Sequence, residues 1–283
     1  MMYIFKKEEL LRDFIKNKEE KIAFVPTMGA LHDGHLSLIK KGKELGGLVV
    51  SSIFVNPTQF DSAEDLKKYP RTVEEDVAKL VSVETDVLLL PSVDEVYPDG
   101  TSPKKTYDFG KLDQTMEGAF RDGHFAGVAQ VVNRLLEMVR PDWIVMGQKD
   151  IQQTTIVRSL LQQTNHKTEL VIAPTIRETD GLAMSSRNRR LTEEERMEAP
   201  ILHAALTEAK DSYKKLLIEE LKANAVEKIE KTGALKVDYL EIVDLHTMQP
   251  IGKWEEAEEF AICTAAFLGK VRLIDNVLIL KEA

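Results

Sequence analysis

Short apolar runs alternate with longer amphipathic segments from residue 22 onward. The runs are apolar at most consecutive positions, as strands buried on both faces of a parallel sheet are. They cover residues 22–25, 48–55, 87–90, 143–146 and 170–173. Strands that alternate with helical segments form a parallel sheet whose crossover helices cover it. The pattern therefore predicts a Rossmann-like α/β sheet with helices on both faces.

Two of the intervening segments carry clear helix signals. Thr72 and Glu75 have the spacing of a capping box, which predicts a helix over residues 73–81. A single apolar stripe at helical spacing then ends at a proline, Pro141. The stripe consists of Val128, Val131, Val132, Leu135 and Val139.

The pattern changes after Pro174. A polar loop covers residues 177–190, and Thr192 with Glu195 forms a second capping-box pattern before a charged helical region that extends to about residue 231. Apolar runs at residues 237–243, 260–267 and 271–279 follow with short links, as antiparallel strands do. We therefore expect two domains: residues 1–176 with the parallel sheet, and residues 177–283 as a smaller α+β lid domain with a short antiparallel sheet.

Composition supports this division and excludes several classes of protein. The chain has 283 residues, of which 43% are hydrophobic, and a domain averages about 150 residues. Lys and Arg number 38 against 47 Asp and Glu, a formal net charge of −9. Proteins that bind double-stranded DNA, and most tRNA-binding domains, need a basic face to release counterions. The balance argues against a nucleic-acid partner but leaves room for a local basic site.

Neither membrane insertion nor disulfide chemistry is expected. No stretch approaches the roughly 18 apolar residues of a membrane span, and residues 6–9 are charged where a signal peptide would be apolar. We therefore expect a cytoplasmic protein. The single cysteine, Cys263, rules out an intrachain disulfide and a cysteine zinc site. Its apolar surroundings predict a small buried side chain.

The first candidate for chemistry is the segment after the first run, Pro26-Thr-Met-Gly-Ala-Leu-His-Asp-Gly-His35. Ligands of open parallel sheets bind beyond the carboxyl ends of strands, where a helix N-terminus favours phosphate. His32 and His35 are three residues apart, so a helical turn puts them on one face, where they can contact one phosphate. A zinc site and a surface histidine pair are the alternatives, although the segment lacks the His-Glu-x-x-His pattern.

Three further polar clusters lie near or after predicted strands. One basic loop reads Gly181-Leu-Ala-Met-Ser-Ser-Arg-Asn-Arg-Arg190, and its arginines and serines suit a polyphosphate. The cluster Gly147-Gln-Lys-Asp-Ile-Gln-Gln153 offers a lysine for an anion and an aspartate for ribose hydroxyls. Asn56-Pro-Thr-Gln59 provides amides for a small polar substrate. Singly, these read as a solvated loop, a helix start and a turn; together they predict one site for small-molecule phosphate chemistry.

These residues carry a family resemblance. The His32-Asp-Gly-His35 segment resembles the HIGH signature of the nucleotidyltransferase superfamily, and Met184-Ser-Ser-Arg187 resembles its KMSKS-type loop. More closely, the chain resembles the pantothenate synthetase (pantoate–β-alanine ligase) family in six ordered blocks between residues 26 and 188. Besides the segments already quoted, the blocks include Tyr69-Pro-Arg-Thr72, Gly123-His-Phe125 and Asp180 with Gly181.

The resemblance implies an ATP-dependent ligase that needs magnesium. It implies that (R)-pantoate is adenylated first, with release of pyrophosphate, and that β-alanine then displaces AMP to give pantothenate, a coenzyme A precursor. It also implies a homodimer. A related nucleotidyltransferase that leaves the nucleotide on its product, or a nucleotide-binding module without catalysis, is the alternative.

The resemblance also implies residue roles. His35, His32, Lys149 and Arg187 would be catalytic, with His35 a proton donor during phosphoryl transfer and Lys149 bridging phosphate and pantoate. The ATP site would consist of Met28, Gly29, Ala30, Leu31, His32, Asp33, Gly34, His35, Gly147, Gln148, Lys149, Asp150, Ile176, Met184, Ser185, Ser186 and Arg187. Pantoate would contact Asn56, Gln59 and Gln153, and Gln59 would also border the β-alanine path. Asp76 is a candidate outer contact for magnesium, although a carboxylate on a helix face is the favoured interpretation of that position, and the ATP phosphates and water would hold most of the metal. Residues 177–190 are expected to be mobile without ATP and to close with it.

Overall fold

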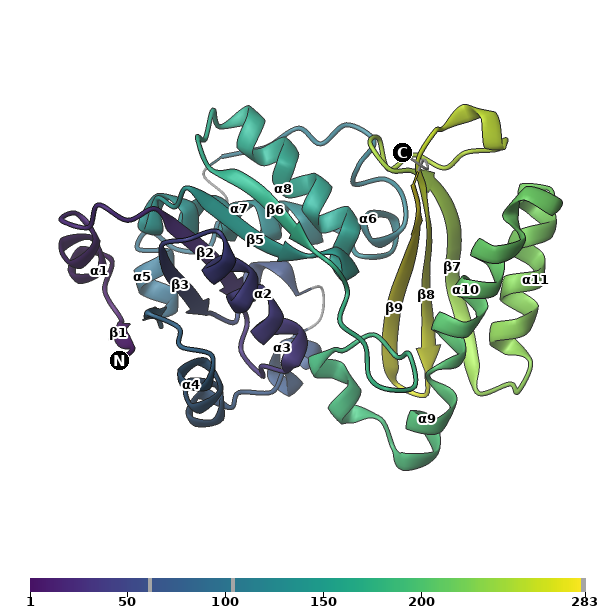
Figure 1. The fold of residues 1–283 in the computed structure, drawn as a ribbon, viewed down its shortest axis with the longest axis horizontal. Helices are drawn as coiled ribbons and strands as arrows, with labels where there is room; N and C mark the ends of the chain where they lie inside the picture. The colour runs from purple at the N-terminus through teal and green to yellow at the C-terminus, as the bar shows by residue number, and fades with distance from the viewer. Residues whose placement is uncertain (61–62, 103–104, 281–283) are drawn as a thin grey trace. The chain divides into compact units, whose positions relative to one another are not determined.

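The fold is described from a computed structural model, which describes residues 1–60, 63–102 and 105–280 (Figure 1). The chain divides into two compact units. Unit 1 contains residues 1–110, 120–148 and 153–174. Unit 2 contains residues 175–283 and also two short segments from earlier in the chain, residues 111–119 and 149–152.

Unit 1 is built on a six-stranded parallel sheet with the strand order β1-β4-β3-β2-β5-β6. The strands are β1 Tyr3–Phe5, β2 Ile22–Thr27, β3 Leu48–Ile53, β4 Val87–Leu89, β5 Trp143–Gly147 and β6 Glu169–Ala173. Every residue of β3 is buried, because helices cover both faces of the sheet. The five predicted strands and the Rossmann-like architecture are confirmed. The sequence pattern missed β1, which has only three residues, two of them exposed.

Helices connect these strands. They are α1 Glu8–Ile15, α2 Asp33–Glu44, α3 Ala63–Lys68, α4 Val73–Ser82, α5 Val93–Val96, α6 Glu117–Phe120, α7 His124–Val139 and α8 Ile151–Gln163, with short 3-10 turns η1 Pro57–Gln59 and η2 Gln148–Asp150. Leu38 and Ile39 of α2 pack with Leu80 of α4 and with Val25 and Val49 of the sheet. Burying these side chains stabilises the unit by about 1.5–3 kcal/mol each.

The helix predicted over residues 73–81 exists, but its predicted capping box does not. Thr72 is the N-cap of α4, yet its side chain makes no cap bond among the described contacts. Its hydroxyl donates instead to the Asp76 carboxylate, with 3.3 Å between the two oxygens. The box prediction at Thr72 and Glu75 was therefore wrong, because a buried carboxylate one turn along competes for the same hydroxyl.

Unit 2 contains a three-stranded antiparallel sheet with the order β7-β8-β9, against which two helices pack (Figure 1). Its elements are η3 Ser186–Arg190, α9 Glu193–Glu198, α10 Ile201–Ser212, η4 Tyr213–Lys215, α11 Ile218–Glu230, β7 Leu235–Asp244, η5 Trp254–Glu256, β8 Phe260–Leu268 and β9 Val271–Ile279. The predicted strands, their antiparallel pairing and the capping box of Thr192 and Glu195 are confirmed. Cys263 is buried, as predicted, and burial raises the pKa of its thiol.

Candidate active site

The loop between β2 and α2 has an unusual backbone. Gly29 and Ala30 have φ values of +80° and +49°, so two successive residues adopt the left-handed region. Ala30 tolerates this conformation at a cost of order 1–3 kcal/mol, which surrounding contacts must offset. Successive N–H groups in such a turn point into one concavity, which suits an anion.

A carboxylate of the protein itself occupies that concavity. Asp76 is fully buried, and its oxygens accept the N–H groups of Ala30 and Leu31 at 2.9 and 2.7 Å. Lys79, one turn further along α4, donates to the Leu31 carbonyl oxygen at 2.7 Å. Helix α4 therefore holds the turn through an acceptor and a donor at once. A β-carbon at residue 29 would lie 3.0 Å from an Asp76 oxygen, so glycine also serves close approach.

His32 and His35 lie together where α2 begins. His32 is the N-cap residue, and the two ring centroids are 4.0 Å apart, which confirms the predicted shared face. The backbone N–H of His32 donates to Nδ1 of His35 at 3.3 Å. Because Nδ1 accepts, the proton of a neutral His35 ring is on Nε2. His35 is therefore prepared to donate from Nε2 beside a helix N-terminus, whose dipole favours negative charge.

The segment after β3 is fixed by its own amides. Asn56 is 1% exposed, and its Nδ2 donates to Gln59 Oε1 at 3.1 Å and to the Gly127 carbonyl at 3.2 Å. Its Oδ1 accepts from the Tyr97 hydroxyl at 2.8 Å. Burial raises the pKa of Tyr97 to about 12, so this hydroxyl stays protonated and donates. Asn56 thus orients Gln59. The contact of Asn56 with pantoate stays a prediction, and pantoate would have to replace one of these hydrogen bonds.

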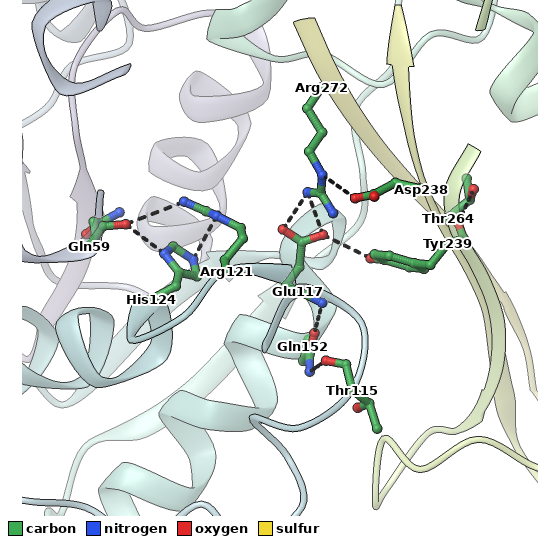
Figure 2. A network of polar contacts seen from close by, with 10 residues as sticks. All are labelled: Gln59, Thr115, Glu117, Arg121, His124, Gln152, Asp238, Tyr239, Thr264 and Arg272. Carbon is green, nitrogen blue, oxygen red and sulfur yellow. Dashed lines mark hydrogen bonds and ion pairs between the residues drawn. The ribbon is translucent and has the colours of Figure 1, made fainter. Parts of the chain in front are cut away.

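Gln59 is also held from α7 and from the β2–α2 loop. Nδ1 of His124 lies 2.9 Å from the Gln59 carbonyl oxygen, and Arg121 reaches the same oxygen and His124 Nε2 (Figure 2). The side-chain amide of Gln59 donates to the sulfur of Met28 at 3.2 Å. Gly127 permits this approach, because a β-carbon there would lie 2.2 Å from the Thr58 carbonyl oxygen. The structure therefore brings Met28 and Gln59, predicted for ATP and for pantoate, into direct contact.

The remaining predicted residues lie in both units. Gly147 is the last residue of β5 and Gln148 follows it in unit 1, where Gln153 is half-buried in α8. Strands β3, β2 and β5 are neighbours in the sheet, so residues 28–35, 56–59 and 147–148 lie at or just beyond the carboxyl ends of adjacent strands. Unit 2 contains Lys149, Asp150, Ile176, Met184, Ser185, Ser186 and Arg187.

The basic loop of unit 2 is anchored more firmly than its polar composition predicts. Leu182 and Ala183 are each 3% exposed, and the backbone of Ala183 pairs with that of Arg177. Ser185 caps η3 by accepting the N–H of Arg187 at 3.3 Å. The expectation that residues 177–190 move on ATP binding stays a prediction.

No ready-made metal centre is visible in the described ranges. Among residues 1–60, 63–102 and 105–280, no group of three or more His, Cys, Asp or Glu side chains is placed to hold an ion. Asp76 is a poor candidate for a magnesium ligand, because its buried oxygens already accept two N–H groups and a hydroxyl.

No helix in the described part of the chain is long and apolar enough to cross a bilayer.

Comparison with known proteins decides the family. Residues 3–278 match the family model described as pantoate-beta-alanine ligase. The chain belongs to the pantoate–β-alanine ligase family. It is 43% identical to the pantothenate synthetase of Vibrio cholerae over 97% of this chain and 94% of the relative. It is 46% identical to that of Fervidobacterium nodosum over 93% of both chains.

Solved structures of this ligase family have the same fold. The pantothenate synthetase of Thermus thermophilus superimposes with a TM-score of 0.91 at 38% identity, covering 98% of this chain and 99% of that one. The Francisella tularensis pantoate–β-alanine ligase, complexed with beta-gamma ATP and beta-alanine, has a TM-score of 0.82 at 35% identity and 98% coverage of both chains. The fold of the ligase family thus extends over 98% of the chain.

Sequence reasoning missed several residues that organise the site. Lys79 carries no motif, Arg177 was predicted only as the first residue of the polar loop, and Asp275 and Asn276 lie far from every candidate segment in the chain. One signal was present for the last pair. Asp275 and Asn276 interrupt an otherwise mostly apolar strand, and polar residues inside such a strand need buried partners.

We expect Asp76→Asn to raise the KM for ATP about 10-fold with little change in kcat. The amide keeps the size of the carboxylate but presents an N–H group to the N–H of Ala30 or Leu31, and one misplaced buried hydrogen bond costs about 1–3 kcal/mol. Steady-state kinetics over a range of magnesium concentrations measure this. If excess magnesium restored the variant, Asp76 would act through the metal and not through the loop.

Proposed function

We propose that the protein condenses pantoate with β-alanine through a pantoyl adenylate. Membership of the pantoate–β-alanine ligase family over residues 3–278 carries this proposal, because it covers every segment to which a role is given. A related nucleotidyltransferase or a non-catalytic module on the same fold is not favoured, since the match extends beyond the nucleotide-binding half of the chain.

In the first step, a pantoate carboxylate oxygen attacks the α-phosphorus of ATP, and the bond to pyrophosphate breaks. Negative charge grows on the leaving pyrophosphate, so hydrogen-bond donors and cations near it lower the barrier. We assign this role to His32, His35, Lys149 and Arg187, with the N-terminus of α2 as a further source of positive potential. Met28 to Leu31 would line the nucleotide, and residues 184–187 would contact its β- and γ-phosphates.

In the second step, the β-alanine amine attacks the acyl carbon, and AMP leaves with the electron pair of its bond to that carbon. The amine loses a proton as the amide forms. No nucleophile of the enzyme is required, because ATP supplies the activating group and binding supplies proximity. Gln59 and Gln153 would orient pantoate, and the bonds from Asn56 and His124 hold Gln59 in place for this.

Magnesium would neutralise charge on the ATP phosphates. Because the Asp76 carboxylate is buried and already accepts two backbone N–H groups, we propose that phosphate oxygens and water, rather than this side chain, would form most of the coordination of magnesium.

We further propose that the protein acts in the cytoplasm as a homodimer. Sedimentation velocity would test the dimer, and a monomer at micromolar concentration would contradict it.

Isotope exchange tests the reaction. Labelled pyrophosphate should enter ATP when enzyme, pantoate and magnesium are present, and should not when pantoate is omitted. Adding β-alanine should then release free AMP in proportion to pantothenate. Exchange without β-alanine-dependent AMP would indicate a nucleotidyltransferase that keeps its nucleotide on the product. ATP binding without any exchange would indicate a non-catalytic module.

A further inference from the structure

Strand β9 carries three polar side chains with partners in other segments of unit 2. They are Arg272, Asp275 and Asn276, and the last two are only 4% and 2% exposed. Groups this deeply buried need hydrogen-bond partners, and an unpaired carboxylate would be especially costly. The partners of Asp275 and Asn276 belong to the segments of unit 2 that contain the basic loop and Lys149.

Asp275 holds the start of the basic loop. Arg177 donates from Nη1 and Nη2 to the two oxygens of Asp275 at 2.7 and 2.9 Å, a two-pronged geometry that fixes direction as well as distance. The same guanidinium donates to the Gly181 carbonyl at 3.1 Å. Gly181 has a φ of +93°, which turns the chain back so that Ala183 pairs with Arg177. Residues 184–187 therefore begin from a point that Asp275 fixes.

Asn276 holds the segment of Lys149. Its Nδ2 donates to the Lys149 carbonyl oxygen at 2.9 Å. Its own backbone N–H donates to Asp275 Oδ1 at 2.7 Å, and its carbonyl accepts from Arg177 at 3.3 Å. The Lys149 backbone and the basic loop are thus held by two neighbouring residues that are bonded to each other.

Arg272 supports the same arrangement from four residues earlier. Side chains alternate along a strand, so Arg272 and Asn276 share a face of the sheet. Arg272 pairs with both oxygens of Glu117 at 2.8 Å, and the Glu117 N–H donates to Gln152 Oε1 at 3.0 Å (Figure 2). Burial raises the pKa of Tyr239, so its hydroxyl remains a donor to Glu117 at 3.1 Å. Residues 149–152 are consequently held at both ends.

We propose that Asp275 and Asn276 form one positioning hub that fixes Lys149 and residues 184–187 relative to each other within unit 2. Neither residue contacts substrate; both act through the segments they hold. The inference rests on the proposed function of Lys149 and the basic loop. Its physical basis is that phosphoryl-transfer groups must be held to a fraction of an ångström, since a shift of about 1 Å can cost 10²-fold in rate.

Hydrogen exchange of the free protein tests the hub without reference to activity. Asp275→Asn keeps the side-chain size but removes the charge that Arg177 needs, and Asn276→Leu removes the bond to Lys149 without changing charge. Asp244→Asn is the matched control, because Asp244 caps a turn of the same unit and contacts neither segment. We expect amides in residues 149–152 and 177–187 to exchange about 10-fold faster in both hub variants, and at the wild-type rate in the control. Loosening of one segment alone would overturn a shared hub.

Pyrophosphate exchange with the same variants tests the role in the reaction. We expect kcat/KM for ATP to fall about 10-fold in Asp275→Asn and in Asn276→Leu, the effect of one lost buried hydrogen bond, and to be unchanged in Asp244→Asn. Should Asp275→Asn fail to fold, Asn276→Leu decides the question alone. Full activity with loosened segments would overturn the positioning role. Absence of exchange in the wild-type protein would instead refute the proposed function, and hydrogen exchange would then decide by itself whether the hub holds both segments.

Discussion

Lys149→Met should lower the rate of pantoate-dependent pyrophosphate exchange about 10³-fold, the upper range for loss of one charge-stabilising group. This corresponds to about 4 kcal/mol of transition-state stabilisation. Methionine keeps the length and much of the volume of lysine but removes the ammonium group that we place between phosphate and pantoate. The substitution leaves the backbone carbonyl of residue 149 available to Asn276, so the segment should stay anchored.

Stopped-flow or steady-state exchange measures this effect, with Lys210→Met as the control. Lys210 is an exposed residue of α10, and the same change there should leave the rate unaltered. Lys149→Arg separates charge from shape, because guanidinium keeps the charge but spreads it over a planar fork. Exchange within a few-fold of wild type in Lys149→Met would remove Lys149 from the chemistry.

His35→Ala should lower the adenylation rate by about 10²-fold, or about 2.7 kcal/mol. The bond from the His32 N–H to Nδ1 leaves the proton on Nε2, so Nε2 is the atom that would donate to the departing phosphate oxygen. Substituting His35 by glutamine or by asparagine therefore tests which ring nitrogen matters. The side-chain amide of glutamine can approximate a donor at Nε2, whereas that of asparagine lies near Nδ1.

We accordingly expect His35→Gln to retain about 10-fold more activity than His35→Asn, if one donated hydrogen bond accounts for the difference. Single-turnover measurement of pantoyl adenylate formation would compare the three variants. His246→Ala is the control, since that histidine is exposed in a turn of unit 2. Equal loss in the glutamine and asparagine variants would show that donation from Nε2 is not the function of His35.

The architecture followed from the sequence to a large extent. The buried strands are apolar at consecutive positions, and such runs predicted β2, β3, β4, β5 and β6 within a few residues of their ends. Apolar runs with short links likewise predicted β7, β8 and β9. These elements are determined locally, because burial on one or both faces leaves its pattern in the order of residues.

The supporting contacts did not follow in this way. Strand β1 is too short to carry a pattern, and its place at the edge of the sheet comes from its parallel pairing with β4. The hydroxyl of Thr72 was predicted to cap its own helix, but a buried carboxylate competes for it. From the sequence alone, a carboxylate on a helix face is expected to be solvated. Only the tertiary structure shows that the loop of Ala30 and Leu31 surrounds Asp76.

The sequence by itself determined the fold class, the segments at the ends of the strands and the family to which they belong. Residues such as His35 and Lys149 could be named as candidates because their chemistry is unusual at those positions. Tertiary structure alone decided what holds them: Asp76 lies 45 residues from the Leu31 amide it accepts, and Asn276 lies 127 residues from Lys149. A hydrogen bond depends on the distance between two groups in space and not on their separation along the chain, so a local sequence pattern does not predict such long-range contacts.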